Sequence, residues 1–210
     1  MRMPASAAAA TDAAHHLVSW MSPEIDRFGI FAFDVESTQT SPFAAVSADA
    51  LKSLDKLPPY GATSLYDALD FTSTALASEG SPRRAVVAIT DGRDTSSTLT
   101  AEQVASRVSI IDVPVYIISI TPDPNEEKSE QVIMGPRSLL DQLTTWTGGQ
   151  LFFAGVPSQA SIAARSIVNE LRQQYILAIS PDPRPGWHKL TVRTKQHHKT
   201  VRARAGYVTR

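Results

Sequence analysis

The sequence of 210 residues contains no cysteine and no apolar run long enough to cross a membrane. The lack of cysteine excludes disulfides, thiol nucleophiles and zinc sites built on thiolates, and it leaves the redox compartment open. A membrane-spanning helix needs about 20 consecutive apolar residues, whereas the longest candidate here, Val113–Ile120, is interrupted by Pro114. The alanines after Met1-Arg-Met-Pro4 do not form the apolar core of a secretory signal. The sequence therefore predicts no membrane span and leaves the localisation unknown.

Common catalytic motifs are also missing. The chain has no Gly-x-Ser-x-Gly elbow, no phosphate-binding Gly-x-x-x-x-Gly-Lys loop, no Gly-x-Gly-x-x-Gly fingerprint and no His-Glu-x-x-His motif. The adjacent His15 and His16 diverge by about 100° around a helix axis, so they do not form a metal site together. These absences argue against the common hydrolases, nucleotide-binding enzymes and metalloproteases.

With 42% hydrophobic and 20% charged residues, the chain has the composition of one ordinary globular domain. Its formal net charge of -1 is unevenly distributed, because residues 184–210 contain eight bases and no acid. A basic tail can mark nucleic-acid binding. Here, however, Leu190, Val192, Val201 and Ala203 alternate with the bases, which is typical of the solvated face of a strand. We therefore predict no nucleic-acid partner.

Apolar runs of strand length alternate with stretches of helical spacing, which is typical of an α/β sheet whose strands are connected by helices. The clearest strand, Ala85–Thr90, is apolar up to its last residue, so we expect it at the centre of the sheet with both faces covered. The other expected strands are 28–33, 38–43, 115–120, 150–153 and 175–180; the expected helices are 5–20, 47–57, 64 to about 80, 100–108, 139–146 and 158–174; and 121–134 is expected to be a polar loop.

The end of the chain predicts a terminal hairpin formed by Lys189–Arg193 and Thr200–Arg204. No shift in composition divides the rest of the chain. We therefore assign residues 1–180 to one α/β domain and residues 181–210 to a basic hairpin extension packed on it.

Two groups of polar residues lie where an open α/β sheet places its ligand sites, outside the carboxyl ends of the strands. Thr63 and Ser64 precede a helix, and the segment from Asp91 to Ser97 follows the clearest strand. Together they offer hydroxyl and carboxylate oxygens, the ligands that Mg²⁺ prefers. Each group also has a structural interpretation, Ser64 as a helix N-cap and Asp91-Gly92 as a turn. On the residues alone, both interpretations stay open.

These polar groups belong to two longer motifs, Gly61-Ala-Thr63-Ser-Leu-Tyr-Asp67-Ala-Leu69 and Ala88-Ile-Thr-Asp91-Gly-Arg-Asp94-Thr-Ser-Ser97. In this order and spacing they resemble the von Willebrand factor type A domain. The segment Asp26–Asp34 looks like that family's second strand, and Tyr175–Tyr207 is similar to the ending of a bacterial subgroup. The resemblance covers most of the chain. It implies a Rossmann-like, doubly wound, mostly parallel sheet with helices on both faces, and a module that binds proteins or other ligands rather than an enzyme.

The resemblance also implies a metal-ion-dependent adhesion site. The family builds it from Asp-x-Ser-x-Ser after the first strand, a Thr in the second loop and an Asp after the fourth strand. Thr63 and Asp91 match the last two, and no strand ending in Asp-x-Ser-x-Ser occurs in this sequence. Asp94, Ser64 and Ser96 are expected at its rim. An incomplete site should bind Mg²⁺ weakly, and the partner implied is a protein that offers an acidic residue.

Met1 stands directly before helix-like sequence, so we hypothesise a truncated or mis-started copy that lacks the family's first strand. An in-frame strand upstream of the Met1 codon would support this. In the doubly wound order the first strand lies between the second and the fourth, so the strands at 28–33 and 85–90 should either expose backbone groups across a gap or pair directly. Both outcomes cost stability, so we expect a marginally stable or aggregation-prone chain.

One enzyme class is weighed as an alternative. The segment Phe31–Thr38 is distantly similar to the strand and aspartyl nucleophile of haloacid-dehalogenase-type phosphatases, with Asp34 as nucleophile and Asp91 and Asp94 as magnesium ligands. That chemistry places a second Asp two residues after the nucleophile as general acid, and Glu36 stands there instead. The binding module is therefore the favoured interpretation.

Overall fold

The computed structural model describes residues 4–47, 49, 52, 54, 63–81, 83–120, 130–195 and 201–209. In chain order the elements are α1 (Pro4–Ser19), β1 (Arg27–Phe33), β2 (Ser37–Ala45), α3 (Leu65–Ala77), β3 (Val86–Thr90), α4 (Ala101–Ile111), β4 (Val115–Ser119), α5 (Glu130–Thr147), β5 (Leu151–Phe153), α6 (Pro157–Gln173), β6 (Gly186–Lys189) and β7 (Gly206–Thr209). The predicted alternation of strands and helices is thus confirmed. Most of the helix predicted at 47–57, and residues 121–129 of the predicted loop, lie outside the described residues; residues 130–134 of that loop are helical.

The strands β3, β4 and β5 form a parallel sheet with β4 in the middle. Val86 pairs with Val115 and Thr90 with Ser119 along β3 and β4. All five side chains of β4 are buried, which explains why the sequence there is a nearly continuous apolar run. The prediction that Ala85–Thr90 would be central is wrong for this sheet, because among the described strands β3 pairs only with β4.

The strands β1 and β2 form a separate antiparallel hairpin, in which Arg27 pairs with Ala45 and Phe33 with Ser37. Among the described strands β1 does not pair with β3, so of the two predicted outcomes direct pairing does not occur. A cavity of about 960 Å³ is lined by residues of both strands. We call this cavity, between β1 and β3, the slot.

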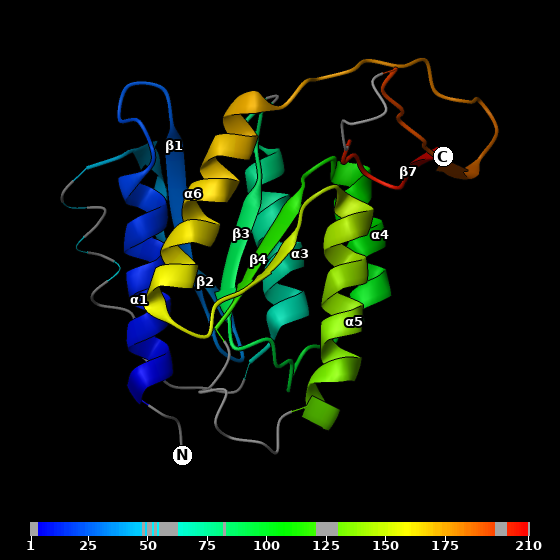
Figure 1. The fold of residues 1–210 in the computed structure, drawn as a ribbon. Coiled ribbons are helices and arrows are strands. Elements are labelled where there is room, and N and C mark those ends of the chain that lie inside the picture. Colours follow the sequence, from blue (N-terminus) through cyan, green and yellow to red (C-terminus); the bar gives the residue numbers. More distant parts are fainter. Residues whose placement is uncertain are drawn as a thin grey trace.

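Helices cover both faces of the parallel sheet, as the doubly wound α/β class requires (Figure 1). On one face Val115 and Ile117 pack in a core with α3, α4 and α5. On the other face Tyr116 and Ile118 pack with α1 and α6. Successive side chains of β4 thus serve two different cores, since neighbouring residues of a strand point to opposite faces.

The strand predicted at 175–180 does not form. These residues follow α6 without regular pairing, and Tyr175 is 91% exposed and Leu177 69% exposed. An apolar run becomes a strand only where a neighbour satisfies its backbone groups, and none of the described strands lies beside this one. We call residues 175–180 the exposed run.

A terminal hairpin is present, but its residues differ from the prediction. Gly186 pairs with Thr209 and Lys189 with Gly206. The first strand therefore overlaps the predicted segment 189–193 only at Lys189, and the second strand lies beyond the predicted segment 200–204. A Cβ on Gly206 would lie 2.5 Å from the ring of Trp187, so this pairing needs glycine at that position. Alternating apolar and polar residues predict a hairpin without fixing its register.

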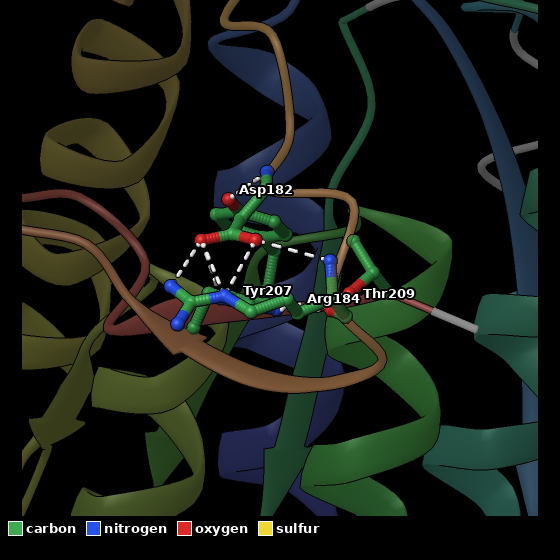
Figure 2. Close-up of polar contacts among 5 residues, drawn as sticks. Asp182, Arg184, Tyr207 and Thr209 are labelled. Carbon is green, nitrogen blue, oxygen red and sulfur yellow. Dashed lines mark hydrogen bonds and ion pairs between the residues drawn. The ribbon is translucent and has the colours of Figure 1, made fainter.

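Polar contacts hold the start of this hairpin, as Figure 2 shows. The backbone N–H of Asp182 donates to the hydroxyl of Tyr207 at 2.8 Å, and the Arg184 guanidinium binds the Asp182 carboxylate. The Arg184 side chain lowers the pKa of Asp182 to about 2. The ring of His188 stacks on Tyr207 with centroids 5.1 Å apart.

The hairpin extension also contacts the α/β body. The Ala205 N–H donates to the carbonyl of Trp146 at 3.3 Å, and Arg204 forms an ion pair with Asp112 on α4's C-cap at 2.9 Å. Arg202 pairs with Glu170 of α6. Part of the basic tail is therefore neutralised by acids of the body, while the division at residue 180 stays a prediction. In the part of the chain that the structure describes, no helix has the length and apolar character of a membrane span.

Candidate functional site

The two predicted metal-site residues line the same cavity. Thr63, just before α3, and Asp91, just after β3, are both half-buried and both line the slot. Backbone hydrogen bonds fix the neighbourhood: the Ser64 N–H donates to the Asp34 carbonyl at 2.7 Å, and the Thr95 N–H donates to the Thr63 carbonyl at 2.8 Å. The ends of β1 and β3 and the start of α3 therefore meet at one end of the slot.

Asp91 is held by a tight turn. Its Oδ1 accepts the Arg93 N–H at 3.1 Å, and Gly92 adopts a φ of 81°, which glycine reaches without a steric cost. A Cβ on Gly92 would lie 3.1 Å from the Ser119 hydroxyl of the neighbouring strand. The turn interpretation of Asp91-Gly92 and the site interpretation are thus compatible, because the turn holds the carboxylate at the edge of the slot.

Asp94 has a structural role in α3. Its Oδ1 accepts the Leu65 N–H at 2.8 Å and the Ser97 hydroxyl at 2.6 Å. The Ser97 oxygen in turn accepts the Tyr66 N–H at 3.0 Å. Together these side chains satisfy first-turn N–H groups of the helix, where a negative charge is also favourable. The Asp94 carboxylate expected at the rim is used in this cap.

Ser64 occupies the N-cap position of α3 without capping it through its side chain. Ser64 is only 1% exposed, and its hydroxyl oxygen has no hydrogen-bond partner among the described residues. The side chains of Asp94 and Ser97 cap α3 in place of Ser64, for which this role was predicted. Sequence reasoning missed Ser97 as a cap because the bonded groups lie 31 residues apart, beyond any local capping pattern.

A second carboxylate ties the same loop to α3. Asp67 accepts the N–H groups of Thr98 and Leu99 at 2.9 and 3.0 Å. Burial opposes ionisation of this carboxyl, but these hydrogen bonds, that of the Thr98 hydroxyl and the charge of Arg107 outweigh it and lower the pKa below its ordinary value. Asp67 and Asp94 thus hold the β3–α4 loop against α3 from two positions.

The protein donors at the slot are too few for a tight Mg²⁺ site. Mg²⁺ prefers about six oxygens in octahedral geometry, whereas Thr63 and Asp91 supply one hydroxyl and one carboxylate. One carboxylate oxygen of Asp94 is engaged at α3. In the described ranges no three His, Cys, Asp or Glu side chains gather as a metal cluster would require.

The phosphatase alternative depends on Asp34, Asp91 and Asp94, and each of these carboxylates accepts a backbone N–H. Asp34 lies in the turn between β1 and β2, where its Oδ1 accepts the Glu36 N–H at 3.0 Å. Its N–H donates to the Glu36 carbonyl at 3.1 Å. Asp94, the second magnesium ligand of that alternative, caps α3. No observation at this site favours the phosphatase over a binding module.

Comparisons with known proteins bear on the family and the fold. Residues 1–93 match the family model described as von Willebrand factor type A domain. No curated protein matches the chain. Three solved structures are similar to it: an aerotolerance-related membrane protein from Bacteroides fragilis (16% identity, 80% of this chain and 89% of that chain, TM-score 0.63), the conserved hypothetical protein BatB from Bacteroides thetaiotaomicron (14%, 80% and 89%, 0.64), and von Willebrand factor type A from Catenulispora acidiphila (15%, 79% and 38%, 0.61). At these identities the likeness shows the fold.

Proposed function

Since residues 1–93 match the von Willebrand factor type A domain model and the chain has a fold similar to solved structures that include a von Willebrand factor type A protein, we propose that it is a protein-binding module, not an enzyme, with an incomplete metal-ion-dependent adhesion site at Thr63 and Asp91. The observation that carries the proposal is that these residues, from different elements, line one cavity. They lie at the end of that cavity next to the carboxyl ends of β1 and β3, and open α/β sheets bind their ligands outside the carboxyl ends of their strands.

The chain's own contribution is to hold two oxygen donors in place. The turn at Gly92 orients Asp91, and the hydrogen bonds between residue 63 and the β3–α4 loop position Thr63. A bound Mg²⁺ would supply positive charge that attracts an acidic side chain of the partner. Because water must fill most of its coordination positions, we expect a dissociation constant of about a millimolar or weaker.

Titration of the isotope-labelled protein with Mg²⁺, followed by acetate as a probe for the partner's carboxylate, tests this function. Amide NMR signals of Thr63 and Asp91 should shift with Mg²⁺, and acetate should shift them further only when Mg²⁺ is present. Asp91→Asn should abolish both responses, since it removes the charged donor.

Asp141→Asn is the matched control, because Asp141 is an exposed carboxylate on α5 that does not line the slot. It should leave the titration unchanged. A response to acetate without Mg²⁺, or one that survives Asp91→Asn, contradicts the adhesion site. Hydrolysis of a phosphate monoester that is lost in Asp34→Asn contradicts the non-enzymatic assignment.

A further inference from the structure

The exposed run leaves consecutive apolar side chains in water. Tyr175, Ile176, Leu177 and Ile179 are 91, 59, 69 and 52% exposed. Single apolar side chains are common on protein surfaces, but a contiguous group of them marks an interaction surface. The exposed run is therefore a candidate contact surface.

Apolar and basic side chains of the basic tail are exposed together. On the solvated face of a strand, the bases would point outwards and the valines between them would be buried. Residues 190–195 and 201–205 are not part of a strand, and Val192 and Val201 are 40 and 43% exposed. The strand-face interpretation of this alternation is thus wrong, and the tail offers both kinds of side chain to solvent.

Part of the positive charge of the tail is not neutralised within the described chain. Residues 184–210 contain eight bases and no acid, and three of these bases form the ion pairs described above. Three others are exposed and have no ion pair with a described acid: Lys189, Arg193 and Lys195. A concentration of charge of one sign attracts partners of the opposite sign, so the partner expected here is anionic.

The exposed run and the tail lie at the same end of the molecule (Figure 1). The run follows the carboxyl end of α6, and Arg204 of the tail pairs with Asp112 at the carboxyl end of α4. Because α4 connects the parallel strands β3 and β4, its carboxyl end lies where β4 begins. Asp91 follows the opposite, carboxyl end of β3, so a partner at the tail would not cover the proposed adhesion site. We call the tail surface the set formed by the exposed run and four side chains: Trp187, Lys189, Arg193 and Lys195.

We propose that the tail surface docks the chain on an anionic lipid membrane. The apolar side chains of the exposed run insert among the acyl chains, and the three unpaired bases bind the anionic headgroups. Docking needs both contributions, because a few apolar residues or a few bases alone give only weak binding. Tyr175 and the half-exposed Trp187 are of the residue types that favour the boundary between headgroups and acyl chains. The proposal goes beyond the proposed function and does not rest on it.

Other partners fit the tail surface less well. A nucleic acid would engage the bases and stack on aromatic rings, but it would leave Ile176, Leu177 and Ile179 in water. A second copy of the chain, docked through the same surface, would bring like charges against each other. A folded protein must match its partner in shape, whereas the run is an irregular segment. A lipid surface accepts apolar and basic side chains together without a matching shape.

Sedimentation with sucrose-loaded vesicles tests the docking. The chain should bind vesicles of phosphatidylcholine that contain about a quarter phosphatidylglycerol, and it should bind vesicles of pure phosphatidylcholine at least about tenfold more weakly. Raising the salt concentration should weaken binding to the anionic vesicles, because salt screens exposed charges. Equal binding to both kinds of vesicle, or binding to neither, would overturn the proposal.

Charge variants locate the electrostatic part of the binding. Lys189→Gln with Arg193→Gln should weaken binding to the anionic vesicles at least about tenfold, since two bases that bind headgroups are lost. The matched control, Lys52→Gln with Arg93→Gln, removes the same charge at exposed positions outside the tail, and it should bind normally. An equal loss in both double variants would show that only the net charge matters, which contradicts docking through the tail surface.

Apolar variants separate docking from simple charge attraction. Ile176→Ser with Leu177→Ser should weaken binding to the anionic vesicles at least about tenfold, because these side chains no longer enter the acyl region. The matched control, Val35→Ser with Ile162→Ser, changes side chains that are 61 and 66% exposed outside the tail surface, and it should bind normally. Circular dichroism verifies that each variant keeps its secondary structure. Normal binding by Ile176→Ser with Leu177→Ser contradicts insertion.

The fluorescence of Trp187 reports where the lipid lies. Phosphatidylcholine brominated in its acyl chains, mixed into the anionic vesicles, should quench the fluorescence of the natural chain, and Trp187→Phe should remove most of that quenching. The other tryptophans, Trp20 and Trp146, lie outside the tail surface. Full quenching in Trp187→Phe, displacement of the chain from the vesicles by a single-stranded oligonucleotide, or a dimer of the chain that Ile176→Ser with Leu177→Ser abolishes would each overturn the proposal.

Discussion

Two aspartates three residues apart in one loop do different work. Asp91 lines the slot and is held by its own turn. Asp94 turns to α3 and accepts hydrogen bonds from Leu65 and Ser97. Both follow the same strand and both belong to one sequence motif, so the difference is visible only through the partners that the fold brings to them.

At this scale we predict that Asp94→Ala destabilises the fold and Asp91→Ala does not. Loss of the Asp94 carboxylate leaves first-turn N–H groups of α3 without their acceptor, which should lower the free energy of unfolding by about 1–3 kcal/mol. Asp91→Ala should change it by about 0.5 kcal/mol or less. Urea unfolding followed by circular dichroism measures both. Equal shifts of the two midpoints would contradict the assigned roles.

At the scale of elements, the β6–β7 hairpin depends on a few polar contacts rather than on a core. Trp187 is 50% exposed, and the hairpin is held by the Asp182–Tyr207 hydrogen bond, the Arg184 ion pair and stacking of His188 on Tyr207. Such a two-stranded unit is marginal by itself. We therefore expect the hairpin to lose its order under conditions in which the α/β body stays folded.

The hairpin should loosen at acidic pH because the Asp182 carboxylate takes part in it. Arg184 lowers the pKa of Asp182 from 3.8 to about 2, so this stabilisation is full above pH 3.8 and is lost as pH falls through about 2. The NMR signal of the Trp187 indole should move between these pH values in the natural chain and stay constant in Asp182→Asn. If the Trp187 signal moves in Asp182→Asn as it does in the natural chain, Asp182 is not the cause.

At the scale of the whole molecule, the slot separates two units that share little backbone bonding. The β1–β2 hairpin and the β3–β4–β5 sheet are distinct sheets, and helices α1, α3 and α6 bridge them from the two faces. A continuous central sheet transmits cooperativity through its hydrogen bonds. Among the described residues, the two units are connected by side-chain packing across the slot and by single polar contacts such as the Ser64–Asp34 hydrogen bond and the Arg172–Asp26 ion pair.

We therefore expect purified monomer to unfold in a broad, weakly cooperative transition. The van't Hoff enthalpy should be smaller than the calorimetric enthalpy, because the β1–β2 unit can separate before the parallel sheet melts. Differential scanning calorimetry at low protein concentration measures both enthalpies, and light scattering follows aggregation. A sharp two-state melt would refute this description of the fold.

The sequence by itself determined the elements and their class. Apolar runs and helical spacing place β1, β3, β4 and the helices α1, α3, α4 and α6 within a few residues, because these patterns report which side chains must leave water. The start of α5, by contrast, was predicted nine residues too late. The motifs around Thr63 and Asp91 place both residues near the carboxyl ends of strands, since a strand followed by polar loop residues is a local feature. The gap between β1 and β3 also followed from the sequence, through the family resemblance and the strand order that it implies.

Only the tertiary structure decided which groups meet. The role of Asp94 depends on amides 28 or 29 residues away, and the exposed run has the pattern of a strand without the neighbour that would make it one. The hairpin register depends on the contact of Gly206 with Trp187. Hydrogen bonds and packing between distant segments arise only in the folded chain, so no local sequence pattern predicts them. The burial pattern and the helical periodicity of apolar residues, by contrast, are visible within each segment alone.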